Sequence, residues 1–179
     1  MIKREETVLI FIDVQGRLHE IMSDKETLDS NMGKVIQCAK LLDVPIVGTE
    51  QIPEKLGVTN EPFQSLLSDV PMIGKSSFSC CGEPAFMEQL ECLGRQQFIL
   101  VGIETHVCVY QTAIALLEFG SEVFVAADAV SSRSLDNKVW ALQAMRDAGA
   151  QILPTESLLF ALLRDAKDPA FKDLLRLIK

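Results

Sequence analysis

Short runs of β-branched and other apolar residues alternate along the chain with longer segments in which apolar residues recur every three or four positions. This alternation is typical of a parallel sheet covered by helices on both faces. Six strands are predicted: Thr7–Asp13, Val44–Thr49, Val70–Ile73, Gln97–Gly102, Glu122–Ala127 and a weaker one at Gln151–Leu153. The pattern therefore predicts an α/β protein, a three-layer α-β-α sandwich around a six-stranded parallel sheet.

Between the strands, helical spacing predicts four amphipathic helices: Leu28–Leu42, Ala85–Leu93, Val107–Phe119 and Leu135–Ala148. Gly120 and Gly149 follow two of these helices, where a left-handed cap is expected. The segment Glu50–Pro62 has two prolines and no clear period, which predicts a loop over the sheet edge that can act as a lid. The C-terminal residues 154–179 also follow a helical pattern. Their apolar stripe is expected to dock on the body of the protein or on another subunit, and it consists of Phe171, Leu174, Leu175 and Ile178.

Composition narrows the classes of partner. The 179 residues are expected to form one domain spanning 1–179, and a net charge of −8 disfavours nucleic acid and anionic membrane surfaces as partners. No stretch approaches the roughly 18 apolar residues of a membrane span. Five cysteines, an odd number without Cys-x-x-Cys spacing, predict neither a disulfide framework nor a zinc site. A reducing compartment is expected, the cytoplasm or alternatively the mitochondrion.

Three chemically capable residues follow predicted strands. Asp13 closes the first strand, Lys75 comes shortly after the third, and Cys108 lies just beyond the fourth at the start of a helix. In open α/β sheets ligands bind outside the carboxyl ends of the strands. With the common strand order 3-2-1-4-5-6, Asp13 and Cys108 lie on neighbouring strands, and Lys75 has to lean back from about 10 Å away.

These residue types suit nucleophilic catalysis. A thiol with an ordinary pKa of about 8.5 is mostly protonated at neutral pH, so it needs a base, and a helix N-terminus and an ammonium favour its thiolate. Each residue also has an ordinary explanation. Asp13 can bond backbone amides of the loop that follows it. Lys75 can be a solvated surface residue, and Cys108 can be an inert core thiol.

Five segments resemble one family, the isochorismatase-like cysteine hydrolases, and within it the isochorismatase domain-containing proteins. They are the first strand from Val8 to Gln15, the lysine segment from Gly74 to Ser79, the stretch from Leu100 to Ala113 around Cys108, and the later stretches from Ala127 to Ser134 and from Gly149 to Phe160. The resemblance implies the isochorismatase-like hydrolase fold and a catalytic triad of Asp13, Lys75 and Cys108. It also implies that the Ile103–Glu104 peptide bond is cis, which turns the backbone amides of Glu104 and Cys108 toward a common oxyanion site.

The sequence differs from the family's nicotinamidase branch in the segment after the second strand. That branch has metal-binding aspartate and histidine residues after the second strand, where this chain reads Thr49-Glu50-Gln51-Ile52-Pro53. No metal and no cofactor are therefore expected. Gln15, Phe78 and His106 are the expected pocket residues.

The leading hypothesis is a metal-independent cysteine hydrolase of a small amide, ureido or related acyl compound, acting through a thioester on a C–N bond other than a peptide bond. The alternative is a non-catalytic module on the same fold that binds a small molecule or a protein. The apolar C-terminal stripe and the habit of the family favour a homo-oligomer.

Overall fold

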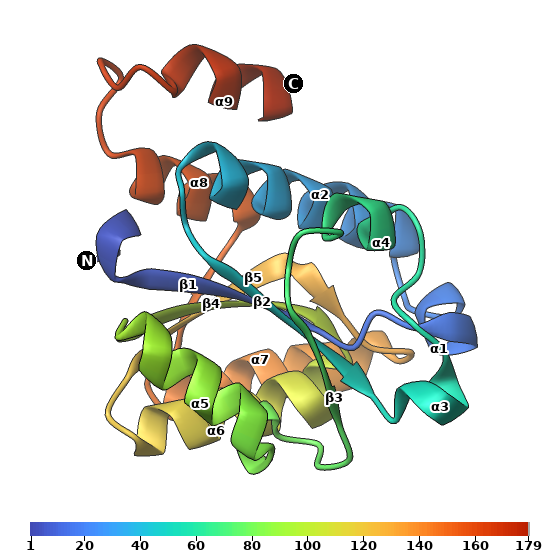
Figure 1. Cartoon of the computed structure of the whole chain (residues 1–179). Coiled ribbons are helices and arrows are strands. Elements are labelled where there is room, and N and C mark those ends of the chain that lie inside the picture. The colour runs from blue at the N-terminus through green and yellow to red at the C-terminus, as the bar shows by residue number, and fades with distance from the viewer. Residues whose placement is uncertain (179) are drawn as a thin grey trace.

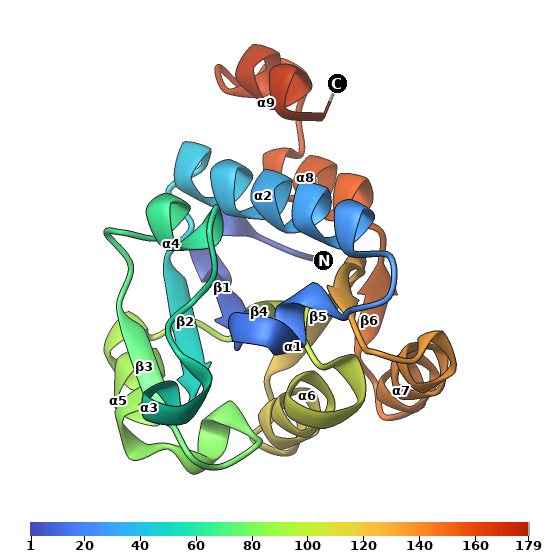
Figure 2. The same cartoon turned by 90° about the vertical axis from the view of Figure 1, so that its right-hand side faces the viewer.

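The computed structural model describes residues 1–178 as one six-stranded parallel sheet with helices on both faces, as Figures 1 and 2 show. The strands, in chain order, are β1 (Thr7–Ile12), β2 (Ile46–Gln51), β3 (Met72–Lys75), β4 (Gln97–Ile103), β5 (Glu122–Ser131) and β6 (Gln151–Leu153). Their spatial order is β3-β2-β1-β4-β5-β6, and every neighbouring pair is parallel. The predicted α/β sandwich and strand order are confirmed.

Two layers of helices enclose the sheet. On one face lie α2 (Lys25–Leu41), α4 (Phe63–Leu66) and α8 (Thr155–Leu163), with α9 (Phe171–Ile178) beyond them (Figure 1). On the other face lie α5 (Pro84–Leu93), α6 (Tyr110–Glu118) and α7 (Leu135–Asp147). Short helices stand at the strand ends and connections: α1 (Gly16–Glu20), α3 (Pro53–Leu56), a π-helical turn Thr105–Val109, and 3-10 turns Arg4–Glu6 and Cys80–Gly82.

The period-2 alternation of the central strand builds two separate cores. Leu9 and Phe11 of β1 pack on the α2 side, whereas Val8, Ile10 and Ile12 pack on the α5 and α6 side. All five side chains are completely buried. The central strands are thus covered on both faces, and the carboxyl ends of the strands are left as the edge where side chains can meet a ligand.

Most of the helices begin and end close to the predicted positions. Gly120 and Gly149 have φ values of 82° and 111° after α6 and α7, so the predicted left-handed caps are confirmed. The segment Glu50–Pro62 is not a plain loop, because β2 continues to Gln51 and Pro53 starts α3. The C-terminal pattern divides into α8 and α9 instead of one helix.

The C-terminal stripe docks on this chain's own body. Leu174 is fully buried in the α2-side core, and Phe171 and Ile178 pack against the same core. The contacts of α9 are made to α2 and α8. Three of the four stripe residues are therefore covered within one subunit, and the stripe does not itself call for a second copy.

Candidate active site

Asp13 is held in a fixed position at the end of β1. Its backbone takes a left-handed conformation with φ of 53°, and its N–H donates to the Thr49 carbonyl at 3.1 Å. The side chain is 4% exposed, and the Thr49 hydroxyl donates to Oδ1 at 2.8 Å. The partners of the carboxylate are thus a hydroxyl on β2 and, as described next, an ammonium, rather than amides of the following loop.

Lys75 is the last residue of β3 and is buried, not solvated. Its Nζ lies 2.7 Å from Asp13 Oδ2. The same ammonium donates to Gln51 Oε1 at 2.5 Å and to the carbonyls of Ser77 and Phe78 at 3.0 and 3.1 Å. Because an ammonium has three protons and these acceptors use all three, Asp13 Oδ2 receives charge stabilisation but no hydrogen bond. That oxygen keeps its lone pairs free to accept a proton from another group.

Cys108 lies in the π-helical turn Thr105–Val109 that follows β4, one turn before the regular helix α6. It is 7% exposed. Burial raises the pKa of the Cys108 thiol, and the negative charge of the Asp13 carboxylate raises it further, while Lys75 lowers it. The net effect is a raised pKa, so the thiol rests in its protonated form. The sequence predicted a resting thiolate, favoured by the helix N-terminus and the lysine. The structure differs because burial and the Asp13 charge have the larger effect on the pKa of Cys108.

The turn that carries Cys108 begins at a cis peptide bond between Ile103 and Glu104, as the resemblance implied. The carbonyl of Glu104 accepts the N–H groups of Val107 and Val109, at 3.1 and 3.2 Å, on either side of Cys108. The Glu104 carboxylate turns to Arg133, whose Nε lies 3.1 Å from Oε1. Amides in the first turn of a helix lack intrahelical acceptors, so the N–H of Cys108 belongs to a class of donor available to a ligand.

Gly102, just before this turn, allows β4 to pass close to β1. Its φ is 120°, and a Cβ at this position would collide with the backbone of Ile12. A side chain there would push the end of β4 away from β1. Glycine at this position therefore helps to bring Asp13 and the Cys108 turn together.

Asp13 and Cys108 open on one small cavity of about 160 Å³. Its polar lining residues are Asp13, Gln51, Glu104 and Cys108, and its apolar ones are Leu18, Leu56, Phe78, Ile103 and Val107. Leu56 and Phe78 are 42% and 54% exposed, which places them at the mouth. The cavity therefore joins a thiol and a carboxylate to a largely apolar chamber.

Of the three expected pocket residues, only Phe78 lines this cavity. His106 faces a different depression beside α7, where its Nδ1 lies 3.0 Å from the Ser132 hydroxyl. It points away because it lies two positions before Cys108 in a helical turn, so the two side chains cannot share a face. The expectation for His106 is wrong.

Gln15 is fully buried and supports the cavity wall instead of lining it. Its Nε2 donates to the carbonyls of Gln51 and Gly57, at 3.2 and 2.5 Å, and its Oε1 accepts the Gln51 N–H at 2.7 Å. These bonds hold the strap Gly57–Asn60, the segment after α3, against β2. The expectation that Gln15 lines the pocket is therefore also wrong.

Two further sets of hydrogen bonds fasten the same strap. Glu50 Oε1 accepts both the N–H and the hydroxyl of Thr59, at 2.6 and 2.8 Å. Asn60 donates its N–H to the Val14 carbonyl at 2.9 Å, and its side chain exchanges two hydrogen bonds with the backbone of Gly16. The segment expected to be a lid thus forms a fixed wall that carries Leu56.

Sequence reasoning missed Gln51 and Thr49 as site residues. Gln51 accepts from Lys75 and lines the cavity, and Thr49 donates to Asp13. Both lie at the carboxyl end of β2, between β1 and β3 in the sheet. Their polarity at the end of a buried strand was the available signal.

A second thiol lies behind the carboxylate. Cys80 is completely buried, and its Sγ lies 3.6 Å from the Thr49 hydroxyl. Burial raises its pKa to about 12, with Asp13 adding to the rise. Cys80 therefore stays a neutral packing thiol.

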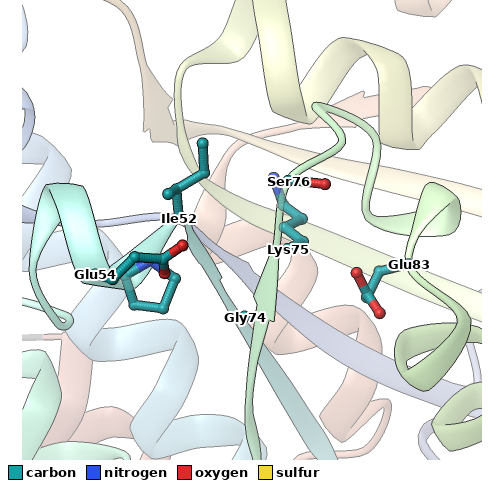
Figure 3. Close-up of a pocket in the computed structure, with 7 residues that line it drawn as sticks. Ile52, Glu54, Gly74, Lys75, Ser76 and Glu83 are labelled. Atoms are coloured by element: carbon teal, nitrogen blue, oxygen red, sulfur yellow. The ribbon is translucent and has the colours of Figure 1, made fainter.

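A larger cleft of about 310 Å³ lies on the other side of Lys75, at the outer edge of β3 (Figure 3). Figure 3 shows Glu54 and Glu83 on either side of the end of β3. Neither Asp13 nor Cys108 lines this cleft, so the smaller cavity is the better candidate for chemistry. Residues 1–178 contain no group of three or more His, Cys, Asp or Glu side chains arranged for a metal, and no helix among them is long and apolar enough to cross a membrane.

Comparisons with known proteins agree with this architecture. The family model described as the isochorismatase domain matches residues 7–157. Isochorismatase domain-containing protein 2A from Mus musculus is 37% identical over 178 residues, covering 98% of this chain and 84% of that protein.

Two solved structures place the fold among known ones. One is titled MAR1 ribonuclease from Caenorhabditis elegans; it has a TM-score of 0.93 and 34% identity, and the match covers 99% of this chain and 91% of that one. The other is the YcaC gene product from Escherichia coli, titled an octameric hydrolase of unknown specificity. It has a TM-score of 0.89 and 21% identity over 99% of this chain and 94% of that one.

Proposed function

This chain belongs to the isochorismatase family, and we propose that within it the protein is a metal-independent cysteine hydrolase of a small amide, ureido or related acyl compound. One observation carries the proposal. The Asp13 carboxylate has an oxygen with no hydrogen-bond donor, its charge raises the pKa of the nearby Cys108 thiol, and both residues border the same cavity. A base with a free lone pair beside a protonated nucleophile is the arrangement that general-base activation needs.

In the proposed first half-reaction, Asp13 takes the proton from Cys108 as the sulfur attacks the carbonyl carbon. The carbonyl electrons move to oxygen, where the backbone amides of Glu104 and Cys108 stabilise the negative charge. The intermediate then collapses: the C–N bond breaks, Asp13 gives its proton to the leaving nitrogen, and a thioester remains on Cys108.

In the second half-reaction, water gives a proton to Asp13 and attacks the thioester carbonyl. Breaking of the C–S bond releases the acid, and Asp13 returns its proton to the sulfur. Lys75 provides the opposite charge that stabilises Asp13 as a carboxylate between these steps. Because Asp13 carries the proton in every step, the raised pKa of Cys108 is compatible with catalysis.

The test is a screen of small amides and ureido acids, with mass spectrometry of the intact protein to detect an acyl adduct. Turnover and an adduct on Cys108 are expected for the native protein, and neither for Cys108→Ala. The matched control is Cys92→Ala, which removes an exposed thiol far along α5 and should leave both unchanged. An adduct that persists in Cys108→Ala contradicts the proposed nucleophile.

The same experiment separates the enzyme from its alternative, a binding module on the same fold. A module binds members of the screen without forming an adduct or consuming them.

Helix α7 carries an exposed apolar surface suited to self-association. It consists of Leu135, Val139 and Trp140, whose side chains are 59%, 54% and 72% exposed. We propose a homo-oligomer on that basis, and sedimentation as a strict monomer would overturn it.

We also propose, from its five cysteines without disulfide or zinc spacing, that the protein works in the cytoplasm. Fractionation of the cells that produce it tests this, because recovery in the medium or in mitochondria contradicts the proposal.

A further inference from the structure

The candidate cavity offers no free positive charge to a ligand. None of its lining residues is lysine, arginine or histidine. Lys75 lies nearby, but its side chain is completely buried and its three protons are donated to Gln51, Ser77 and Phe78. Arg133 is paired with Glu104, and its side chain is 58% exposed to solvent. A ligand carboxylate would therefore find no cation to pair with.

The charged groups that do border the cavity are carboxylates, Asp13 and Glu104. Each is already paired with a cation of this chain, so a ligand anion would lose its hydration in a mostly apolar chamber with no unpaired cation to replace it. In contrast, an uncharged amide keeps no charge to be desolvated, and its NH₂ group donates hydrogen bonds that a carboxylate at this end of the cavity can accept. The polar end of the cavity thus favours an uncharged ligand that donates.

Size limits the rest of the ligand. At roughly 30 Å³ for a water-sized group, 160 Å³ holds about five such groups. The walls beyond the polar end are Leu18, Leu56, Phe78, Ile103 and Val107, which offer no hydrogen-bonding side chain. The remaining part of the ligand is then short and apolar.

We propose, resting on the cysteine hydrolase function above, that the substrate is an uncharged primary carboxamide with a short apolar acyl chain, about five or six non-hydrogen atoms in all. Ureido acids and amides that carry a carboxylate are excluded from the cavity by their charge. The apolar chain contacts the wall formed by Leu56 and Phe78, and the NH₂ group faces Asp13.

The test compares two thiol reagents that differ in charge but not in the number of non-hydrogen atoms, iodoacetamide and iodoacetate. Each alkylates a cysteine by displacing iodide, so neither depends on amide hydrolysis. The rate is measured at Cys108 and, as an internal standard, at the exposed Cys92, by peptide mass spectrometry of the whole protein. The ratio of the iodoacetamide rate to the iodoacetate rate should be at least tenfold larger at Cys108 than at Cys92.

A charge added to the wall should change this preference. Leu56→Arg places a cation at the mouth and is expected to reduce the ratio at Cys108 at least threefold. Leu56→Met keeps the wall neutral and should retain the native ratio within a factor of two. Phe119→Arg adds the same charge at the end of α6, outside the cavity lining, and should leave the ratio unchanged.

The outcomes distinguish this inference from the function it rests on. Equal normalised rates at Cys108, or a preference for iodoacetate, overturn the uncharged-substrate inference while leaving a reactive Cys108 nucleophile in place. Labelling of Cys108 by neither reagent overturns the proposed function itself. Hydrolysis should follow the same order, with kcat/KM at least tenfold higher for butyramide than for oxamate, which has the same number of non-hydrogen atoms but carries a carboxylate.

Discussion

Asp13 and Lys75 form a buried ion pair, so the cost of burying each charge is expected to depend strongly on the presence of the other. Their side chains are 4% and 0% exposed, and the charged atoms lie 2.7 Å apart. At an effective dielectric constant near 20, the attraction is roughly 6 kcal/mol before the cost of desolvating both groups. Removing one partner of such a pair leaves an unpaired buried charge, which lowers the free energy of unfolding by about 3–5 kcal/mol.

The perturbation is a double-mutant cycle with Asp13→Asn, Lys75→Met and the variant carrying both changes. Each single variant should lose about 3–5 kcal/mol at pH 7. The double variant leaves no unpaired charge, so it should be more stable than the sum of the single losses predicts, by about 2–3 kcal/mol. The three acceptors of Lys75 lose their donor in both Lys75→Met backgrounds, so that loss cancels from the coupling.

The assay is urea unfolding followed by far-ultraviolet circular dichroism, with hydrolysis measured in parallel. Hydrolysis should fall by at least about 10²-fold in all three variants, because the double variant regains stability without regaining the base. As a control, the same cycle on the exposed pair Lys3 and Glu6, 3.7 Å apart, should give a coupling of at most about 0.5 kcal/mol. Losses for Asp13 and Lys75 that add within about 0.5 kcal/mol would refute the reasoning.

Three further predictions follow from the site and its surroundings. Asp13→Asn should lower the pKa of Cys108, because the negative charge of Asp13 raises it. Alkylation of Cys108 at pH 7 should then become faster, while hydrolysis falls about 10²–10⁴-fold. Slower alkylation contradicts this prediction. Burial raises the pKa of Cys38 to about 12. Between pH 9 and 11 the unfolded state therefore releases a proton that the folded state keeps, so the free energy of unfolding falls as pH rises. Cys38→Ala should reduce the slope of this fall by about 1.4 kcal/mol per pH unit, and an unchanged slope contradicts the prediction. Single-stranded RNA should remain uncleaved, because the chain has a net charge of −8 and the cavity is small. Cleavage of RNA that disappears in Cys108→Ala would contradict the proposed small acyl substrate.

The architecture could be predicted from sequence because periodicity reports burial directly. The run Val8–Ile12 is buried on both faces, and the sequence shows it as an unbroken apolar strand. The boundaries were less accurate. The third strand was expected at Val70–Ile73 and lies at Met72–Lys75, because its short, partly exposed edge position gives little hydrophobic signal. As a result Lys75 is part of the strand and not of the loop after it.

The site could be predicted only where strand ends identify it. Asp13, Lys75 and Cys108 lie at or just after the ends of β1, β3 and β4, so topology alone brings them to one edge. The roles of Gln15 and His106 depend on side-chain direction, which spacing along the chain does not give. The raised pKa of Cys108 depends on how much solvent the folded turn excludes, which a sequence also does not state.

The strap Gly57–Asn60 has a practical consequence for changing specificity. Its fastening bonds run to Gln15, Glu50 and the backbone near Val14, while the side chain that meets the ligand, Leu56, comes just before it on α3. The recognition surface and its attachment points are thus carried by different residues. Exchanging residues 54–56 as a cassette, with the strap and its anchors retained, would give new binding preferences on an unchanged catalytic frame.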